Sequence, residues 1–430
     1  MRIIAVSLII LLVLAAALSG SLLYFIFLYP LFMSFMWMIG GIYFYYRIER
    51  RNPGPEVTPT LKAYPFVSIL IPCFNEGDNL SETIAAACQQ KWPSFEVIAI
   101  NDGSSDDTSS ALVRLTKEHP QLRVVQLAKN QGKAIALRMG ALVARGDYFV
   151  CVDGDAMLHP NATANLMKPF LDNPRVGAVT GNPRIRNRST ILGKIQVGEF
   201  SSIIGLIKRA QRVYGLIFTV SGVIAAFRRS ALHSCGYWDP FMITDDIDIS
   251  WALQLKHWQI QYEPNALCWI LMPETLSGLH KQRVRWAQGG AEVFLKYMSR
   301  LWVWQDRRMW IIAIDYLLST AWAYCYLFSL ILWCLGKYFV MPAALNVPTI
   351  FPPAFWGLLL STVNLGQFMT ALIIERRYEP KLPRLLIWII WYPVCFWLIA
   401  LFSTLEGVPR ALFKRRSRRA LWGNSDRGFR

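Results

Sequence analysis

The sequence contains few charged residues, and acids are the scarcer kind. Charged side chains make up 17% of the 430 residues, and 28 Asp and Glu stand against 45 Lys and Arg. Hydrophobic residues reach 54%, which is more than an ordinary soluble protein contains. This composition indicates an integral membrane protein whose basic loops face the cytoplasm and anionic lipid. We do not expect nucleic-acid binding, because the basic residues are scattered or flank apolar runs.

Several cysteine and glycine motifs are absent. The eight cysteines form no Cys-x-x-Cys pair, and most lie inside apolar runs. They are typical of small buried side chains in a reducing compartment, not of a disulfide framework or a zinc site. The chain also lacks Gly-x-Gly-x-x-Gly after its first strand and lacks Gly-x-x-x-x-Gly-Lys-[Ser/Thr]. These absences argue against a dehydrogenase and a phosphate-loop ATPase.

Apolar runs near the start of the chain predict membrane helices. Ile3–Leu18 and Leu22–Tyr46 are apolar and together are long enough for two spans of ~20 residues joined by a tight turn. A cleaved signal peptide is the alternative, but no small-residue cleavage site precedes a polar segment. Three arginines follow, which places the next region in the cytoplasm. We therefore expect two transmembrane helices over residues 1–50 and a proline-containing linker over 51–65.

Further apolar runs begin after residue 308 and are also long enough to span. They predict about three transmembrane or membrane-associated helices over 309–405, followed by a basic tail over 406–430. Three crossings would place this tail outside, against the positive-inside rule. Either one run is interfacial or re-entrant, with Leu385–Leu405 and its Pro393 as the candidate, or the tail breaks the rule. The three runs are Trp310–Cys334, Ile350–Ile374 and Leu385–Leu405.

Between residues 66 and 308, short apolar runs alternate with helical stretches. Strands are predicted over 67–76, 95–104, 122–130 and 148–152, in units of ~30 residues that imply right-handed crossovers and a mainly parallel sheet. We therefore predict an α/β fold, with a Rossmann-like domain over 66–308 between N- and C-terminal membrane helices. Later segments are predicted as strands over 176–186, 218–229 and 261–274. An amphipathic helix is predicted over 193–214, which we expect to pack on the core, with a position on the membrane surface as the alternative.

Two carboxylates follow the apolar run Tyr148–Val152. Asp153 and Asp155 flank a glycine, and ligands of open α/β sheets collect beyond the carboxyl ends of strands. Two acids in this position suit a hard divalent cation that also holds phosphate oxygens. A β-turn capped by aspartate is the alternative for an isolated Asp-Gly-Asp.

Other polar residues follow the neighbouring predicted strands. Asp102, in Asn-Asp-Gly-Ser, is placed to accept a hydrogen bond from a base or ribose, or is a plain turn residue. Lys133, after Gly132, brings a cation and free backbone N–H groups to a helix start, where a simple helix cap is the alternative.

Two later motifs carry further candidates. Asp245, Asp246 and Asp248 open a predicted helix, where acids also serve as ordinary capping residues. Lys281–Gly290 carries two guanidiniums beside an indole, which could bind a diphosphate while Trp286 packs a sugar face. A basic membrane-facing helix is the alternative for this second motif.

In their order, these motifs resemble the signature of processive family-2 glycosyltransferases, which build β-linked polysaccharides. IPCFNE, NDGSSDDT, NQGKAIAL, VTGNPRIR, TVSGVIAAFRRS and LMPETL…RWAQGGAEVF are similar, within that family, to the bacterial poly-β-1,6-N-acetyl-D-glucosamine synthases. The likeness covers nearly the whole chain. One departure is Asp245, which replaces the glutamate of the usual Thr-Glu-Asp and leaves the final acid, Asp246, in place.

The resemblance implies a GT-A catalytic domain and a role for each motif. Asp102, with Lys133 or the backbone beside it, would bind the uridine of UDP-GlcNAc. Asp153 and Asp155 would hold UDP and a Mg²⁺ or Mn²⁺ ion. Asp246, preceded by Asp245, would be the general base. Diphosphate and acceptor sugar would be bound by Gln282, Arg285 and Trp286.

The resemblance also implies the setting of the reaction. It implies an inverting, processive N-acetylglucosaminyltransferase in the bacterial inner membrane, with a cytoplasmic catalytic domain, which extends a polysaccharide for the biofilm matrix and couples synthesis to export. A small second membrane subunit and control by cyclic di-GMP would accompany it. The alternatives are a synthase of hyaluronan, chitin or cellulose, a transferase that glycosylates a lipid, and a transporter or sensor with a degenerate nucleotide-binding domain.

Overall fold

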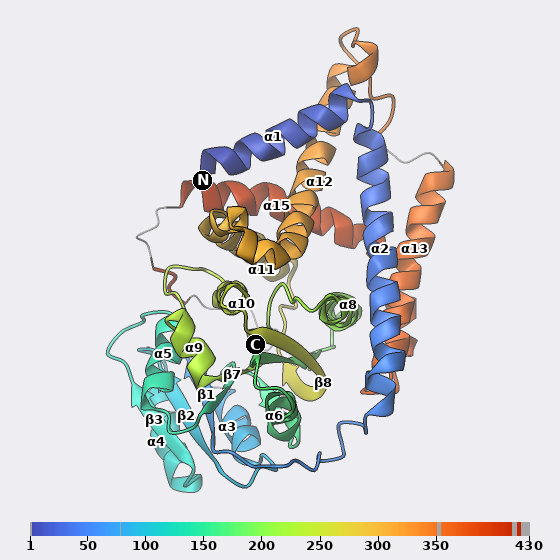
Figure 1. The fold of residues 1–430 in the computed structure, drawn as a ribbon. Coiled ribbons are helices and arrows are strands. Elements are labelled where there is room, and N and C mark those ends of the chain that lie inside the picture. Colours follow the sequence, from blue (N-terminus) through green and yellow to red (C-terminus); the bar gives the residue numbers. More distant parts are fainter. Residues whose placement is uncertain (1, 78, 351–353, 415–418, 423–430) are drawn as a thin grey trace.

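The computed structural model describes residues 2–77, 79–350, 354–414 and 419–422. An α/β domain lies below a group of long apolar helices, and both ends of the chain contribute to that group (Figure 1). The strands of the described residues form one sheet of eight, in the order β3-β2-β1-β4-β7-β6-β8-β5. They are β1 (Val67–Cys73), β2 (Phe95–Asn101), β3 (Leu122–Gln126), β4 (Tyr148–Val152), β5 (Met157–Leu158), β6 (Val176–Ile185), β7 (Ile224–Arg228) and β8 (Gln259–Ile270).

The helices fall into three groups along the chain. Those before the sheet are α1 (Arg2–Leu18), α2 (Leu22–Arg47) and the 3₁₀ turn η1 (Glu49–Arg51). The domain contains α3 (Leu80–Cys88), α4 (Thr108–Glu118), α5 (Lys133–Val143), α6 (Ala162–Asp172), α7 (Ile191–Phe200), the π-helix η2 (Ser201–Leu206), α8 (Ile207–Tyr214), α9 (Arg229–Cys235), α10 (Asp245–Leu255) and α11 (Leu276–Tyr297). After it come η3 (Arg300–Trp302), η4 (Trp304–Met309), α12 (Trp310–Leu335), η5 (Ala343–Leu345), α13 (Ala354–Glu375), η6 (Leu382–Leu385), α14 (Leu386–Ile389) and α15 (Tyr392–Phe413).

The sheet is mainly parallel where the nucleotide-type motifs lie. Strand β1 pairs in parallel with β2 on one side and with β4 on the other, and β2 pairs in parallel with β3. Strand β7 runs antiparallel to both of its neighbours, β4 and β6. The carboxyl ends of β1, β2 and β4 therefore meet at one edge of the sheet. This architecture confirms the predicted Rossmann-like fold.

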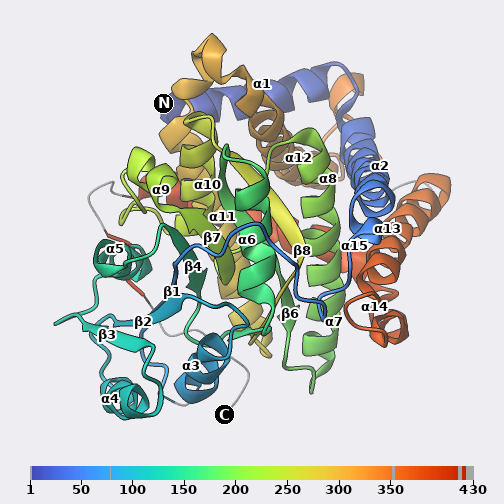
Figure 2. The ribbon, with the colours of Figure 1, turned by 60° about the horizontal axis from the view of Figure 1, so that its bottom comes forward.

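Helices cover both faces of the sheet, so its central strands β1, β2, β4 and β6 are buried along nearly their whole length. Alternate residues of β1 belong to two core clusters. Ile69 and Ile71 lie in the cluster that includes residues of α3, α4 and α6, whereas Leu70 lies in the cluster that includes residues of α5 and α9. Figure 2 shows these helices around the sheet. Strand β1 itself is fully buried. The domain thus consists of three layers, with the sheet between two layers of helices.

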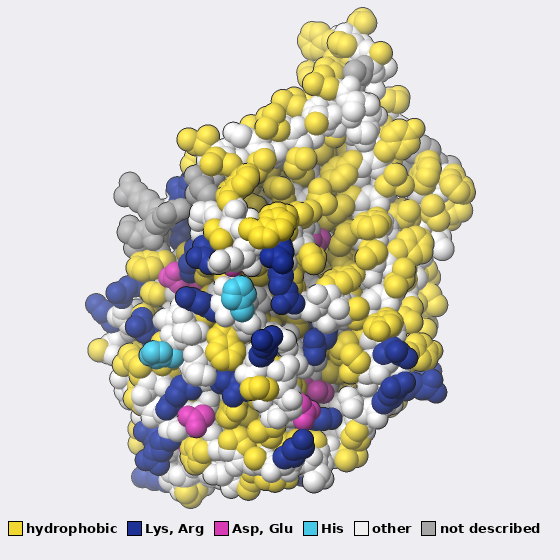
Figure 3. Space-filling view, in the orientation of Figure 1, with side chains coloured by type: hydrophobic (Ala, Val, Ile, Leu, Met, Phe, Trp, Pro, Cys, Tyr) yellow, Lys and Arg dark blue, Asp and Glu magenta, His cyan; other side chains and the backbone are white. Residues whose placement is uncertain are grey.

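Within the part of the chain that the structure describes, four helical segments are long and apolar enough to cross a membrane. They are Leu22–Arg51, Trp304–Leu335, Phe355–Glu375 and Cys395–Phe413. Helix α1 is apolar but has only 17 residues, which is shorter than the ~20 that a span needs. Its assignment as a second N-terminal span stays a prediction. Hydrophobic side chains dominate the upper part of the face in Figure 3, and Lys and Arg gather below it, beside the α/β domain.

The third C-terminal run is broken, as its proline suggested. The chain turns between α14 and α15, and Pro393 lies in the first turn of α15. Helix α15 crosses the direction of α2 and α13 instead of running beside them (Figure 1). It packs closely on α11, since a Cβ built on Gly407 would lie 2.7 Å from the backbone nitrogen of Gln288. These observations favour the interfacial alternative for this run.

Several local expectations were wrong. Strand β7 was expected from residue 218 but begins only at Ile224. The backbone N–H groups just before it donate to side chains instead of to a neighbouring strand: Val220 N donates to Ser250 Oγ, and Ser221 N donates to Thr180 Oγ1. Residues 193–214 are helical, but the charged side of this helix is buried as well as the apolar side. Glu199, Lys208 and Arg209 are each at most 3% exposed. Their partners lie far away in the sequence, so an amphipathic pattern alone could not reveal their burial.

Candidate active site

The site is built at the common carboxyl edge of β1, β2 and β4. Asp102 follows β2, and Asp153 and Asp155 follow β4. Gly154 fits tightly between the two acids, because a Cβ at this position would lie 3.0 Å from the Cγ of Glu76 and 3.2 Å from the carbonyl oxygen of Pro72. A side chain here would push the Asp-Gly-Asp turn away from β1. The close packing explains why a glycine separates the acids.

Asp102 organises the loop that starts α5. Its carboxylate accepts hydrogen bonds from the backbone N–H groups of Gln131 at 2.8 Å and Gly132 at 2.7 Å, and the residue is fully buried. Burial raises the pKa of Asp102, and the two N–H donors oppose that rise. Gly132 has a φ of +92°, which favours glycine. The structure therefore gives Asp102 a loop-shaping contact, and its contact with a nucleotide stays a prediction.

Lys133 joins the two halves of the site. Its ammonium forms an ion pair with Asp153 and donates to the carbonyl oxygen of Gly222 at 3.0 Å. Burial opposes ionisation of Lys133, but the nearby charges of Asp153, Asp245 and Asp246 outweigh it and raise its pKa. Lys133 is thus a fixed positive charge between the β4 acids and the start of α10.

The Asp153–Asp155 pair has the chemistry of a cation site. Burial and the charge of Asp153 raise the pKa of Asp155 to about 7, which means that two ionised acids here need a further positive charge. No cluster of three or more His, Cys, Asp or Glu residues suitable for a metal occurs in the described residues. A pair of carboxylates fits a hard cation whose other ligands are phosphate oxygens and water. The donor set therefore suits a metal that arrives with a nucleotide.

Asp246 faces Lys133 from the other side. Thr244 precedes α10 and packs against Gly289 of α11, where a Cβ would collide with the Thr244 side chain. A Cβ on Gly222 would lie 3.2 Å from Asp246 Oδ2, so the backbone of Gly222 forms a wall beside this carboxylate. Burial, then the charge of Asp245, raises the pKa of Asp246 to about 6, and Lys133 and Arg285 oppose the rise. A half-buried carboxylate with this pKa can serve as a general base near neutral pH.

Helix α11 carries the last group of predicted residues. Arg285 is exposed, and its charge acts on Asp246, which places the guanidinium toward the site. Gln282 is turned differently: its amide nitrogen lies 3.9 Å from the sulfur of Met272 and its oxygen accepts from Arg283. Trp286 is partly buried beside Phe200. The roles of Gln282 and Trp286 in binding diphosphate and acceptor sugar therefore stay predictions.

Arg283 does not face the acids, although two guanidiniums of this motif were expected to bind a diphosphate together. Its Nη2 lies 2.8 Å from Glu199 Oε1, and both side chains are buried. Its guanidinium carbon lies 4.2 Å from the centre of the Trp286 ring. Arg283 therefore packs behind Trp286, and Arg285 alone is available to a diphosphate from this motif.

The end of the chain returns to the site, which sequence reasoning did not predict. Ala420 N donates to the carbonyl oxygen of Pro240 at 2.9 Å, and Asn130 Nδ2 donates to the carbonyl oxygen of Trp422 at 2.9 Å. The Trp422 ring stacks near Phe74, with centroids 6.3 Å apart. Residues 419–422 therefore lie on the same side of the membrane helices as the α/β domain. Most of the expected basic residues of the tail lie outside the described residues.

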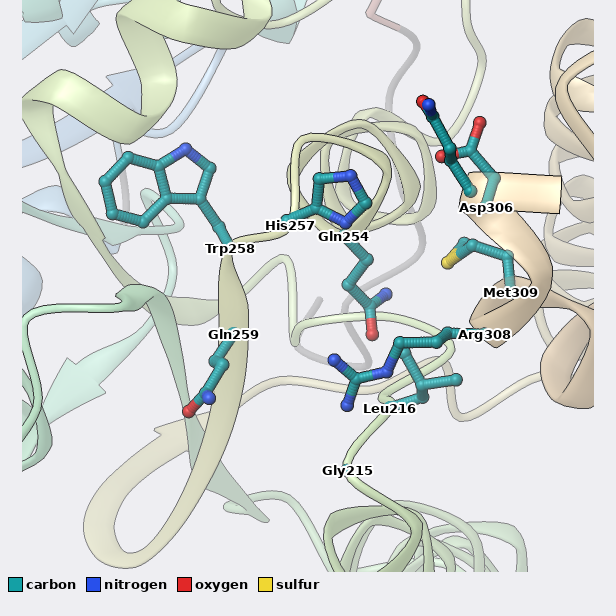
Figure 4. A pocket seen from close by; sticks show the side chains of 10 residues that line it. Gly215, Leu216, Gln254, His257, Trp258, Gln259, Asp306, Arg308 and Met309 are labelled. Atoms are coloured by element: carbon teal, nitrogen blue, oxygen red, sulfur yellow. The ribbon is translucent and has the colours of Figure 1, made fainter. Parts of the chain in front are cut away.

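A separate small pocket does not belong to this site. It is lined by residues such as Gln254, Trp258, Asp306 and Arg308, between the end of α10 and the start of α12 (Figure 4). Its volume of about 30 Å³ is enough for a water molecule and too small for a nucleotide sugar.

The fold and the acids at its strand ends define a glycosyltransferase. The family model of glycosyl transferase family 2 matches residues 68–236. The chain is 40% identical over 410 residues to the poly-β-1,6-N-acetyl-D-glucosamine synthase of Staphylococcus epidermidis, covering 94% of this chain and 98% of that protein. The synthase of Staphylococcus aureus strain MSSA476 is also 40% identical, over 411 residues, with the same two coverages. The chain belongs to this family of poly-β-1,6-N-acetyl-D-glucosamine synthases, within glycosyl transferase family 2.

A solved structure supports the fold. A mannosyltransferase from Pyrobaculum calidifontis, in complex with GDP-Man and Mn²⁺, matches with a TM-score of 0.58 at 20% identity, covering 91% of this chain and 99% of that one. At this identity the likeness bears on the fold alone.

Proposed function

We propose that this protein transfers N-acetylglucosamine from UDP-GlcNAc to a growing β-1,6-linked poly-N-acetylglucosamine chain, with inversion and processively. The observation that carries the proposal is the placement of Asp246 opposite Asp153 and Asp155, with Lys133 between them. In such a site Asp246 would be the base on the acceptor side, and Lys133 would supply positive charge on the leaving-group side. An inverting transfer needs both groups at once.

The proposed reaction exchanges the bond between C1 of the donor sugar and UDP for a bond to the acceptor. Asp246 takes the proton of the acceptor's primary hydroxyl, whose oxygen forms a bond to C1 of the donor sugar. The bond between C1 and the phosphate oxygen breaks, and UDP leaves with that electron pair. Lys133 and Arg285 would stabilise negative charge on the diphosphate. Asp102 shapes the loop that would meet the uridine, and Trp286 would pack a face of the acceptor sugar.

A Mg²⁺ or Mn²⁺ ion is the cofactor we propose. Asp153 and Asp155 would hold it, and a divalent cation supplies charge neutralisation at the diphosphate. The binding of an ion would also relieve the repulsion that raises the pKa of Asp155. The ion pair with Lys133 would hold the Asp153 side chain oriented for this contact.

The cellular setting is also part of the proposal. The protein would lie in the bacterial inner membrane, in contact with lipid, with its catalytic domain in the cytoplasm and synthesis coupled to export. The basic side chains beside the α/β domain in Figure 3 support that orientation. A small second membrane subunit and control by cyclic di-GMP rest on the family resemblance alone. Unchanged activity when cyclic di-GMP is added to membranes with both subunits would contradict that control.

The test uses membranes that contain the full chain. UDP-GlcNAc, UDP-glucose and UDP-glucuronate are offered separately with Mg²⁺, UDP release is followed, and the polymer is digested with a β-1,6-hexosaminidase. We expect UDP release and digestible polymer from UDP-GlcNAc alone, and neither from Asp246→Asn. Turnover of another donor would keep the mechanism and replace the product by another β-linked polysaccharide. A single-sugar lipid product would indicate a lipid transferase.

A further inference from the structure

Lys208 is a buried cation that the proposed mechanism does not use. The residue is 3% exposed, and its ammonium donates one hydrogen bond, to Thr180 Oγ1 at 3.0 Å. No carboxylate lies within ion-pair distance of it among the residues that the structure describes. Its neighbour Arg209 is buried to a similar extent but contacts both Glu49 and Glu375. Burying a charge without a carboxylate partner costs free energy, so the burial of Lys208 needs a reason other than an ion pair.

Lys208 is connected through Thr180 and Ser221 to the Gly222 backbone beside Asp246. Thr180 Oγ1, its partner, also accepts from Ser221 N at 2.7 Å. Ser221 is followed by Gly222, whose backbone packs against the Asp246 carboxylate. The contacts thus lead from Lys208 through β6 to the turn before β7 and then to Asp246.

The electrostatics point to the same neighbour. Burial lowers the pKa of Lys208 to about 7, and Asp246 is the acid whose charge opposes this fall. Lys133, the other lysine of the site, is engaged by Asp153 and by the carbonyl oxygen of Gly222. Besides Arg285, Asp246 therefore experiences Lys133 on the β4 side, where the diphosphate would lie, and Lys208 on the α8 side.

The local helix geometry is also unusual at this point. The π-helix η2 ends at Leu206, two residues before Lys208, and π-segments inside α-helices are frequent at functional sites. Such a segment changes which side chains face inward. Here the side chains of two adjacent cations, Lys208 and Arg209, are both buried in the protein.

The proposed product supplies a chemical reason for a second cation. A 1,6-linkage uses a primary hydroxyl, which rotates about the C5–C6 bond and is therefore harder to hold than a ring hydroxyl. A reaction at such a group gains from any contact that fixes the reacting atom beside its base. An ammonium with donors left after its bond to Thr180 can bind an oxygen of the same sugar.

We propose that Lys208 is an acceptor-binding residue, whose ammonium hydrogen-bonds an oxygen of the terminal acceptor sugar and holds its primary hydroxyl against Asp246. This inference rests on the proposed function, because it names the acceptor side of that same site. It assigns the donor nucleotide to the Lys133 side and the acceptor to the Lys208 side.

The test separates acceptor binding from donor binding. Lys208→Met, Lys208→Gln and Lys208→Arg are prepared in full-length protein, and rates are measured against a β-1,6-linked N-acetylglucosamine oligomer at saturating UDP-GlcNAc. We expect Lys208→Met to raise the KM for the oligomer about 10- to 100-fold, the range for a lost hydrogen bond to a charged group. The KM for UDP-GlcNAc should stay within about twofold, and Lys208→Arg should recover part of the loss. Lys117→Met, on the exposed side of α4, is the matched control.

Thermal stability distinguishes substrate binding from a structural role. Removal of a buried charge without a carboxylate partner should leave the melting temperature of Lys208→Met equal to or above that of the wild type. A lower melting temperature in both Lys208→Met and Lys208→Gln, with a raised KM for UDP-GlcNAc, would show that the lysine only supports the Ser221 turn and would overturn the inference. An unchanged KM for the oligomer would overturn it too. If the wild type released no UDP from UDP-GlcNAc, the proposed function would fail, and this inference with it.

Discussion

The guanidinium of Arg283 lies 4.2 Å from the centre of the Trp286 ring and forms an ion pair with Glu199 at 2.8 Å. Glu199 also accepts from the Tyr392 hydroxyl at 2.8 Å, so α15 contributes to the same contact. Three helices, α7, α11 and α15, therefore fix the back of the indole that would pack the acceptor sugar. One arginine of the motif positions the ring, and the other faces Asp246.

Replacement of Arg283 by leucine should destabilise the protein strongly. The change leaves Glu199 buried without its cation, and breaking a buried pair in this way costs about 3–5 kcal/mol. Glu199→Gln should lose less, because the amide oxygen can still accept hydrogen bonds from both Arg283 and Tyr392. Thermal unfolding in detergent measures both. A melting temperature for Arg283→Leu equal to that of the wild type would show that the pair is not needed to hold the indole.

The activity should depend on pH through Asp246. A general base works in its ionised form, and the pKa of Asp246 is raised to about 6, so the rate should increase as pH rises through 6 and fall below it. An ordinary aspartate would place this limb near pH ~4. The measurement is the rate of UDP release at low donor concentration between pH 4.5 and 8.

Asp245→Asn is the control for that assignment. It removes the carboxylate that helps to raise the pKa of Asp246, so the acidic limb should move to lower pH. A limb that stays in place would mean that Asp245 does not act on the base. Asp246→Asn itself should lower the rate by about 10²- to 10⁴-fold, the usual contribution of general-base catalysis.

The sequence allowed prediction of the parts of the site that depend on local order. Asp102, Asp153 and Asp155 follow apolar strands, and parallel strands bring their carboxyl ends to one edge. The short strand β5 was not predicted, because two residues are too few to show the alternating pattern of a strand. The predicted start of β7 was wrong, because the backbone N–H groups before Ile224 donate to side chains. The burial of Lys208, Arg209 and Glu199 depends on partners from distant elements, and a single helical pattern does not contain that information.

The contact of Arg209 with Glu49 and Glu375 should be essential for joining the α/β domain to the membrane helices. Arg209 Nε and Nη2 lie 2.6 and 2.9 Å from the Glu49 oxygens, and Nη1 contacts Glu375 at the end of α13. Arg209→Met leaves two acids buried together, which should destabilise the protein by at least about 3–5 kcal/mol. Arg212→Met, one turn later on α8 and without an ion pair in the described residues, should have a much smaller effect. Equal melting temperatures for the two variants would contradict this role.

Residues 419–422 should stabilise the loop at the start of α5. The carbonyl oxygen of Ala420 lies against Gly132, Arg419 Nη1 donates to Gln131 Oε1 at 2.5 Å, and Trp422 contacts both Asn130 and Phe74. The same loop donates two N–H groups to Asp102, so the tail and the predicted uridine site share a backbone segment.

Trp422→Ala tests this coupling. Loss of an aromatic pair removes about 0.5–1.5 kcal/mol, so the KM for UDP-GlcNAc should rise by about 2- to 10-fold, while the KM for the acceptor stays unchanged. Trp422→Phe keeps an aromatic ring beside Phe74 and should retain most of the wild-type value. Gly132→Ala should be more severe than either, because it places a Cβ against Ala420 and forces alanine to a φ of +92°. A lower KM in Trp422→Ala would mean instead that the tail occupies part of the nucleotide site and competes with the donor.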